Sequence, residues 1–394
     1  MPAVFFMTRT AGARPAHTVL CHETGDFFME KTVCELFAGV GGFRLGLEAA
    51  DPAWKTVWMN QWEPSRKHQD AYDCYCAHFG HKKEYVNEDI ASIDKKTIPD
   101  HTLLVGGFPC QDYSVAHTGA KASSVAFLAK QAFSIAGLRQ GCHDEKGRGS
   151  LFFELARILY AKKPKAAFFE NVKNLLTHDN GRTIKIICET LKALGYHVDY
   201  RVLNATEYGN IPQNRERIYI VAFRDIEDFD AFSWPEPIPL TRSVRAIIDF
   251  EKRMPEKYYY TKGKYSGLIY EKLQEAMEDD DSQHPGIYQW RRWYVRKNQH
   301  GVIPTLTANQ GGGGHNVCIV KTQCGIRKMT PRECFNAQGF PATFRLPDES
   351  DSRLYKQAGN SVCVPVIARI ARQITLALSA QGIVQEALAC DGSR

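Results

Sequence analysis

The sequence lacks the patterns that mark several protein classes. None of its twelve cysteines forms a Cys-x-x-Cys pair, and Cys74-Tyr75-Cys76 does not suit a zinc knuckle. Scattered cysteines favour reduced thiols over a disulfide framework, and we expect no metal. There is no run of about 18 apolar residues, so we expect no membrane span. Residues 4–7 are too few for the apolar core of a secretory signal, and Arg9 follows them.

The charge of the chain is modest. Fifty lysines and arginines against 44 acidic residues give a formal net charge of +6. This value is compatible with a polyanionic partner but does not establish one. The 394 residues, 44% hydrophobic and 24% charged, are typical of a globular cytoplasmic protein with one large domain and a smaller one.

The order of apolar patterns predicts an α/β fold. Strands are expected at 31–37, 56–59, 101–105, 166–169, 198–203 and 218–223, and helices at 43–50, 65–79, 151–161 and 183–194. This alternation predicts a mostly parallel, Rossmann-like sheet with helices on both faces. A glycine-rich turn at 38–42 joins the first strand to the first helix, as in nucleotide-binding units.

Composition shifts divide the chain. We expect an N-terminal extension at 1–30, which is either disordered or precedes a later start at Met29, a large α/β domain at 31–237, and a small loop-rich domain at 238–350. Residues 351–382 would return to the large domain, and 383–394 would form a tail. The small domain is indicated by clustered prolines at 235–239 and by interleaved aromatic and basic residues at 257–265 and 289–297.

Several chemically capable side chains lie at the expected sheet edge. Cys110 follows a buried strand and a Gly/Pro turn, which suits a nucleophile, although a buried cysteine often only fills space. Glu170 also follows a strand and could instead cap a helix. Arg215 and Arg217 precede a strand and, taken alone, could be a surface charge cluster. Asn360-Ser361 is expected to open the last helix, where it could simply be an N-cap.

The order of these motifs resembles the DNA cytosine-5 methyltransferases of bacterial modification systems. The resemblance covers about residues 31 to 380. It rests on Phe37-Ala-Gly-Val-Gly-Gly42, Gly107-Phe-Pro-Cys-Gln111, Glu170-Asn-Val-Lys-Asn174, Gln213-Asn-Arg-Glu-Arg-Ile-Tyr219, Arg327-Lys-Met-Thr-Pro-Arg-Glu-Cys334 and Gly359-Asn-Ser-Val362. It implies an S-adenosylmethionine-dependent methyltransferase fold with a target-recognition domain.

The resemblance implies a covalent mechanism on a cytosine that is flipped out of duplex DNA. Cys110 would add to C6 of the base and make C5 nucleophilic. Glu170 would hydrogen-bond N3, Arg217 would hold O2, and Arg215 would help to position the site. The methyl donor would be S-adenosyl-L-methionine. No residue is identified as the base that removes the C5 proton, and water could do so.

The resemblance also places a cofactor site. Its expected residues are Phe37, Gly39, Gly41, Gln61, Trp62, Glu63, Asp89, Ile90, Pro109, Leu151, Asn360 and Ser361. Gln61 departs from the family pattern, in which a glutamate commonly binds the ribose hydroxyls. Either the Gln61 amide or the Glu63 carboxylate would do so here, unless Gln61 is only a loop residue.

The segment after Cys110 is unusually long. Leu151 follows Cys110 by 41 positions, roughly twenty more than in many members of the family. Residues 111–116 are echoed by residues 131–136, but the second copy lacks Pro-Cys. The insert could alter loop closure over the flipped base or be a neutral extension. Gln111 and Ser114 match positions near the flipped nucleotide.

Base recognition is expected in the small domain. Thr305, Thr307, Asn309 and Gln310, with the glycine run that follows, are the candidate base-reading residues. Residues 290–297 could contact phosphates or form part of the small-domain core.

The expected partner is double-stranded DNA, and the expected state is a monomer. A cognate restriction endonuclease acting separately is implied by the resemblance only. Two alternatives remain open at this point: an RNA cytosine-5 methyltransferase, and a non-catalytic DNA-binding regulator on the same scaffold.

Overall fold

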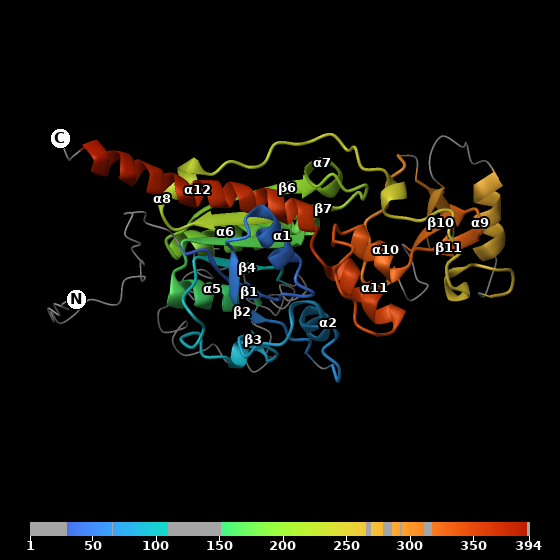
Figure 1. Ribbon diagram of the computed structural model, residues 1–394, viewed down its shortest axis with the longest axis horizontal. Helices are drawn as coiled ribbons and strands as arrows, with labels where there is room; N and C mark the ends of the chain where they lie inside the picture. The colour runs from blue at the N-terminus through green and yellow to red at the C-terminus, as the bar shows by residue number, and fades with distance from the viewer. Residues whose placement is uncertain are drawn as a thin grey trace, which may run out of the picture.

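The protein is described here from a computed structural model (Figure 1). The structure describes residues 30–64, 66–108, 151–264, 269–278, 286–291, 294–298, 300–310 and 317–391, the last eleven of them as backbone only. Two β-sheets organise these residues, one of seven strands and one of four.

The seven-stranded sheet has the strand order β3-β2-β1-β4-β5-β7-β6. Its strands are β1 (Thr32–Leu36), β2 (Lys55–Asn60), β3 (Tyr85–Val86), β4 (Leu103–Gly106), β5 (Ala166–Val172), β6 (His197–Asn204) and β7 (Glu216–Phe223). All neighbouring pairs from β3 to β5 are parallel, whereas β7 is antiparallel to both β5 and β6. This confirms the predicted mostly parallel sheet.

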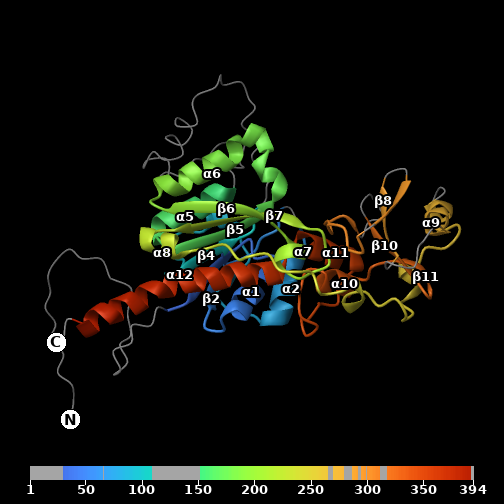
Figure 2. The ribbon, with the colours of Figure 1, turned by 90° about the horizontal axis from the view of Figure 1, so that it is seen from above.

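Helices cover both faces of this sheet, as Figure 2 shows. One face carries α1 (Gly42–Ala50) and α12 (Val364–Asp391), and the other carries α5 (Leu151–Lys162) and α6 (Arg182–Ala193). The strands alternate accordingly: Phe168 faces the cluster with α1 and α12, and Phe169 faces the cluster with α5 and α6. Both faces of the sheet are therefore buried under helices, as is usual for parallel sheets.

Shorter helices complete the large unit. They are α2 (Asp70–Phe79), α7 (Ala205–Tyr208), α8 (Ile226–Ala231) and the 3-10 turns Ile90–Ser92, Lys173–Leu176 and His178–Gly181. The second helix was expected to begin at residue 65, which is wrong: α2 begins at Asp70. The Glu63 carboxylate accepts from the Ala71 nitrogen and so caps the helix, while Gln69 and Glu63 close the preceding loop on itself.

The second sheet is antiparallel, with strand order β11-β10-β8-β9. It contains β8 (Ile287–Arg291), β9 (Tyr294–Lys297), β10 (Cys318–Thr322) and β11 (Gly325–Lys328). Helix α9 (Ile269–Glu278) packs on it through Leu273 and Met277, and 3-10 turns lie at Val244–Ala246 and Glu256–Tyr258. In Figure 1 this sheet lies at the end of the molecule away from β3 and α5.

The chain returns to the large sheet through α10 (Pro331–Asn336), α11 (Asp351–Asn360) and α12. Asn360-Ser361 was expected to open the last helix, which is wrong: Asn360 ends α11, and α12 begins at Val364. Pro365 explains this start, since proline is favoured in the first helical turn. The stretch Asp351–Ala380 is long and apolar enough to cross a membrane, but 67% of its most apolar window is buried within the protein. This burial is that of a core helix.

Candidate active site

The order of the parallel strands reverses at β1, which lies between β2 and β4. Ligands of open α/β sheets bind at the carboxyl ends of the strands on either side of such a point. Here the loop at 37–41 leaves β1, and Gly107 and Phe108 leave β4. The predicted cofactor turn and the peptide leading to Cys110 are therefore neighbours at one sheet edge.

The turn after β1 has an unusual backbone. Phe37 has φ of 52°, a strained value for a residue with a side chain, and Gly39 and Gly41 have φ of 55° and 87°. A Cβ on Gly41 would lie 2.3 Å from Phe79 Cε2, so only glycine fits there. The amide oxygen of Gln61 accepts a hydrogen bond of 2.7 Å from the Gly39 nitrogen and holds the turn from β2.

Gln61 and Glu63 have different surroundings. Gln61 is 8% exposed, and its amide nitrogen has no hydrogen bond assigned among the described residues. The Glu63 oxygens bind Lys356 Nζ at 2.6 Å and the Ala71 nitrogen at 3.1 Å. Glu63 is thus committed to contacts with α2 and α11, whereas the Gln61 amide nitrogen is not. Trp62 between them is 37% exposed at the same edge.

The other predicted cofactor residues occupy varied places. Ile90 is buried, and the Asp89 side chain caps the 3-10 turn by accepting from the Ala91 nitrogen. Ser361 lies beside the start of α1, because a Cβ on Gly42 would approach its Oγ to 3.1 Å. Asn360 is exposed, and Leu151 packs partly buried at the start of α5. Pro109 lies outside the described residues.

Glu170 and Arg217 form the centre of the catalytic candidate. They lie on the same face of adjacent antiparallel strands, as diagonal neighbours: Glu170 is opposite Tyr219, and Arg217 is opposite Val172. Arg217 Nε lies 3.1 Å from Glu170 Oε1, and both side chains are largely buried. The pair is therefore set by strand register and not by a flexible loop.

The same strand end reaches the peptide that precedes Cys110. A Cβ on Gly107 would lie 3.5 Å from Glu170 Oε2, and the Asn171 amide donates to the Phe108 carbonyl at 2.8 Å. Asn171 is 4% exposed and was not assigned a role from the sequence. The sequence contained a signal that could have identified Asn171, namely a polar amide next to a candidate catalytic carboxylate at the end of a strand. Cys110, Gln111 and Ser114 lie outside the described residues.

Burial dominates the protonation of Glu170. It raises the pKa of Glu170, while the charges of Arg217 and then Arg215 lower it and leave a net increase. A carboxyl group in this state holds its proton to a higher pH than an exposed glutamate does and can donate it as a hydrogen bond. This is the property that a partner for a ring nitrogen requires.

Arg215 is fully enclosed and acts differently. Its guanidinium donates to the carbonyls of Leu306, Gly359 and Ser361 at 3.0, 3.1 and 2.6 Å. Burial, reinforced by the charge of Arg217, lowers the pKa of Arg215 to about 9. The residue thus ties the start of β7 to the segment between β9 and β10 and to the junction of α11 and α12.

Gln213 strengthens this joint and was missed in the sequence. Its amide accepts from the Leu306 nitrogen and donates to the Ala337 carbonyl, and the side chain is fully buried. The Asn214 nitrogen also donates to the Ile303 carbonyl at 2.8 Å. A side-chain pattern could not reveal partners about 90 to 120 positions away, because the pattern carries no tertiary information.

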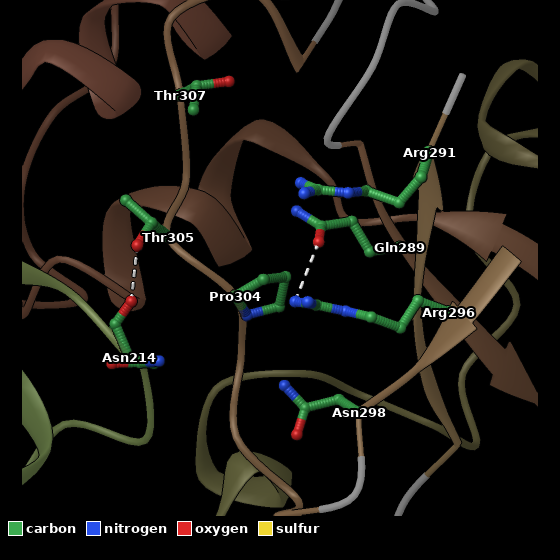
Figure 3. A pocket seen from close by; sticks show the side chains of 8 residues that line it. All are labelled: Asn214, Gln289, Arg291, Arg296, Asn298, Pro304, Thr305 and Thr307. Carbon is green, nitrogen blue, oxygen red and sulfur yellow. Dashed lines mark hydrogen bonds between the residues drawn. The ribbon is translucent and has the colours of Figure 1, made fainter. Parts of the chain in front are cut away.

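Two neighbouring cavities lie near this strand end, and only the first is lined by a member of the Glu170–Arg217 pair. One of about 270 Å³ is lined by Val172, Lys173, Asn174, Asn214, Glu216, Arg217 and Thr305. The other, about 220 Å³, is lined by Asn214, Gln289, Arg291, Arg296, Asn298, Pro304, Thr305 and Thr307 (Figure 3). We call them the catalytic cavity and the hairpin cavity. Asn214 and Thr305 line both, so the cavities are neighbours.

The predicted base-reading residues divide between two environments. Thr305 and Thr307 line the hairpin cavity, and the Thr305 hydroxyl donates to the Asn214 carbonyl at 2.5 Å. Gln310 is 3% exposed and donates to Cys334 Sγ at 3.2 Å, which favours a structural role. Asn309 is exposed in the turn between them. Among the described residues no group of three or more His, Cys, Asp or Glu side chains could hold a metal.

Residues 31–124 and 131–376 match the model of the C-5 cytosine-specific DNA methylase family. The chain therefore belongs to this family, whose reaction is methylation of DNA cytosine at C5; an RNA substrate or a non-catalytic role is not favoured. The interruption at 125–130 falls within the long segment between Cys110 and Leu151, and the match resumes at Gln131, where the second copy of the repeat begins.

Individual relatives agree with this assignment. The chain is 48% identical over 342 residues to the Type II methyltransferase M.Bsp6I of Bacillus sp. strain RFL6, covering 87% of this chain and 98% of that protein. It is 35% identical over 358 residues to M.HhaI of Haemophilus parahaemolyticus, covering 88% and 94%. A solved structure of a Spodoptera frugiperda DNMT2 variant has a TM-score of 0.62 at 17% identity, over 87% of this chain and 99% of that one, and shares the fold.

Proposed function

We propose that the protein methylates cytosine in duplex DNA through a covalent bond between Cys110 and C6 of the base. The observation that carries this proposal is the buried Glu170–Arg217 pair, whose carboxyl oxygen lies against Gly107, three residues before Cys110. A donor for N3 and a cation for O2 would thus stand beside a thiol, which is the set that addition to a pyrimidine needs.

The electron flow follows from these groups. The Cys110 thiolate forms a bond to C6, the C5–C6 π electron pair becomes a C4–C5 double bond, and the C4–N3 π pair moves onto N3, which takes the proton of Glu170. C5 would then accept a methyl group from the sulfonium of the methyl donor, and the electron pair of the broken bond would stay on the sulfur of the donor. A water removes the C5 proton, the C5–C6 double bond re-forms, the Cys110 thiolate leaves, and N3 returns its proton to Glu170. Arg217 offsets negative charge at O2 throughout.

The donor proposed is S-adenosyl-L-methionine, which supplies an electrophilic sulfonium methyl when bound. The fit rests on the glycine turn, whose positive φ values open the backbone of Gly39 and Gly41 to a ligand. Phe37 and Trp62 would offer aromatic faces to the adenosine, and Gln61 would donate to its ribose hydroxyls. Ser361 stands beside the start of α1 and would close the site on that side.

The catalytic cavity is proposed to receive the flipped cytosine. It opens beside Arg217 and is flanked by Val172, which is 39% exposed, and by Lys173. The proposal includes a monomer that acts on double-stranded DNA. It also includes the division of the chain into a large domain at 31–237, a small domain at 238–350 and a return to the large domain at 351–382. A separate restriction endonuclease is suggested by the Type II names of the relatives.

A trapping experiment tests the mechanism. Sequencing of modified cytosines in DNA exposed to the protein identifies the target motif. A duplex that carries 5-fluorocytosine at the target should then form a covalent complex that survives denaturing electrophoresis, because fluorine at C5 cannot leave as a proton does. Cys110→Ser should abolish both turnover and the trapped complex, with the dissociation constant for S-adenosylmethionine changed less than about twofold.

Cys188→Ser is the matched control, because Cys188 lies on α6 in a partly buried position away from the candidate site. It should trap as the wild type does. Turnover by Cys110→Ser near the wild-type rate, or a trapped complex that persists in it, contradicts the mechanism.

A further inference from the structure

The β8–β9 hairpin has two chemically distinct faces. Tyr288 and Trp290 on β8, with Val295 on β9, pack toward α9. Gln289 and Arg291 alternate with them along β8 and so point to the opposite face. Register places Arg296 directly opposite Gln289. This face therefore carries the polar side chains of Gln289, Arg291 and Arg296, next to the buried Ile287 at the start of β8.

This polar face forms one wall of the hairpin cavity. Gln289, Arg291, Arg296 and Asn298 point from the hairpin toward Pro304 and Thr305 on the facing segment, as Figure 3 shows. Two of these side chains are guanidiniums, and none of the described residues that line the cavity is acidic. The cavity is thus an electropositive recess whose walls present mainly hydrogen-bond donors.

Gln289 holds one of the two guanidiniums in place. Its amide oxygen accepts a hydrogen bond of 3.2 Å from Arg296 Nη2, and the side chain is only 6% exposed. A buried glutamine fixed by strand pairing is a rigid support, whereas an isolated surface arginine samples many rotamers. The remaining donors of Arg296 are left available to a ligand, arranged in a planar fork.

We infer that the hairpin cavity binds the major-groove edge of a guanine close to the target cytosine, with Arg296 as the base-contacting residue and Gln289 as its positioning residue. Guanine presents the two acceptors O6 and N7, which match a guanidinium fork in a bidentate contact. This inference rests on the proposed function, because it places duplex DNA across the adjoining catalytic cavity. It assigns base contact to the hairpin rather than to Asn309 and Gln310.

The two cavities share part of their walls, which limits how far the guanine can lie from the target cytosine along the DNA. Asn214 and Thr305 line both cavities, so a base at the hairpin cavity belongs to the same short stretch of DNA as the flipped cytosine. The Thr305 hydroxyl bond to the Asn214 carbonyl fixes this common wall. We expect the guanine within about three base pairs of the target cytosine.

A pair of phosphate oxygens offers Arg296 the same acceptor chemistry as the guanine edge. Substitutions of Arg296 distinguish a phosphate contact from a guanine contact. Arg296→Lys keeps the charge but loses the planar fork. If Arg296 contacts guanine, the variant should lose discrimination at one motif position by about 10- to 100-fold, measured by methylation of a randomised duplex library. Its affinity for the cognate duplex at low salt should change much less than that of Arg296→Ala.

The positioning role of Gln289 is tested by replacing the side-chain oxygen that accepts the hydrogen bond from Arg296. Gln289→Leu removes the oxygen that holds Arg296 and should relax the same motif position, whereas Gln289→Glu keeps an acceptor and should retain discrimination. Arg253→Ala removes an exposed arginine that lies before α9 and outside the hairpin, and controls for the loss of one positive charge.

Three results would overturn the inference. A wild-type motif without guanine within three base pairs of the methylated cytosine would exclude the ligand. A uniform loss of affinity across all sequences in Arg296→Ala, with the salt slope reduced by about one and the motif unchanged, would assign Arg296 to phosphate. A Gln289→Leu profile identical to the wild type would remove the positioning role. None of these affects the Cys110 trapping test, which fails independently if the proposed function is wrong.

Discussion

Arg217 donates from Nε to Glu170 Oε1 across 3.1 Å, between adjacent antiparallel strands of the large sheet. The pair combines two opposed influences on one carboxyl group, because burial raises the pKa of Glu170 and the neighbouring guanidinium lowers it. Their balance leaves a carboxyl group that holds a proton more readily than an exposed glutamate. The guanidinium keeps its own charge for a second acceptor.

Replacement of Glu170 by glutamine tests the need for that proton. The amide can donate a hydrogen bond but cannot transfer a proton, so we expect kcat to fall by about 10²- to 10⁴-fold. In the wild type, kcat should decline as the pH rises through the elevated pKa of Glu170, because the proton donor is then lost. Glu170→Gln should lack this alkaline decline. Single-turnover rates measured upward from pH 4.5, the ordinary pKa of a glutamate, follow both effects.

Glu207→Gln is the control for this profile, since Glu207 is an exposed residue of α7. It should keep the wild-type alkaline limb. An alkaline limb of unchanged position in Glu170→Gln would assign the titration to another group.

Gln61 is predicted to serve two purposes at the cofactor site. Its oxygen holds the Gly39 nitrogen at 2.7 Å, and its amide nitrogen is the proposed ribose donor. Gln61→Ala removes both, so we expect S-adenosylmethionine to bind about tenfold more weakly, the equivalent of about 1.4 kcal/mol for roughly one lost hydrogen bond. Isothermal titration calorimetry measures the change. Glu63→Gln, which keeps the shape of a side chain turned to α2, should weaken binding far less.

If Glu63→Gln instead weakened the binding of the donor more than Gln61→Ala, the carboxylate would be the ribose ligand. The Lys356 and Ala71 contacts of Glu63 would then have to open when the donor binds.

The Lys356–Glu63 ion pair joins α11 to the loop before α2, and 293 positions separate its members. The pair is only partly buried, so its coupling should be modest, about 0.5 to 1 kcal/mol. A double-mutant cycle of Lys356→Met and Glu63→Gln, followed by urea unfolding, measures it. Lys321→Met supplies a comparison, because Lys321 Nζ donates to the Met277 carbonyl at 2.9 Å and forms no ion pair among the described residues. A coupling energy indistinguishable from zero would show that the ion pair does not contribute to stability.

Much of the fold was predictable because the strands of a parallel sheet carry continuous apolar runs. The positions of Glu170 and Arg217 at one edge followed from the ends of those runs, once the motif order was known. The joint made by Gln213 and Arg215 was not predictable, since their partners include Leu306 and Gly359, whose proximity only the folded chain defines. The polar face of the hairpin was hidden for a related reason: without strand register, Gln289 and Arg296 belong to an undivided aromatic and basic run.

Glu35 on β1 gives a final prediction that concerns stability. Its side chain is fully buried, Oε2 accepts from the Tyr75 hydroxyl at 3.2 Å, and Oε1 has no hydrogen-bond partner among the described residues. Burial raises the pKa of Glu35 to about 8, against an opposing influence from Arg44. In the unfolded chain the group has an ordinary pKa of about 4.3. The folded state therefore binds the proton more tightly, and this contribution to stability is lost as the pH rises from about 4.3 through 8.

Glu35→Gln removes this titration while retaining an acceptor for Tyr75. The free energy of unfolding of the variant, relative to the wild type, should therefore increase between pH 5 and pH 8.5. Urea unfolding at both pH values measures the difference, and Glu189→Gln on the exposed side of α6 controls for the loss of one carboxylate. A relative stability that stays constant or falls with pH would show that Arg44 keeps Glu35 ionised in the core, and that the unpartnered Oε1 is satisfied by a contact with that charge.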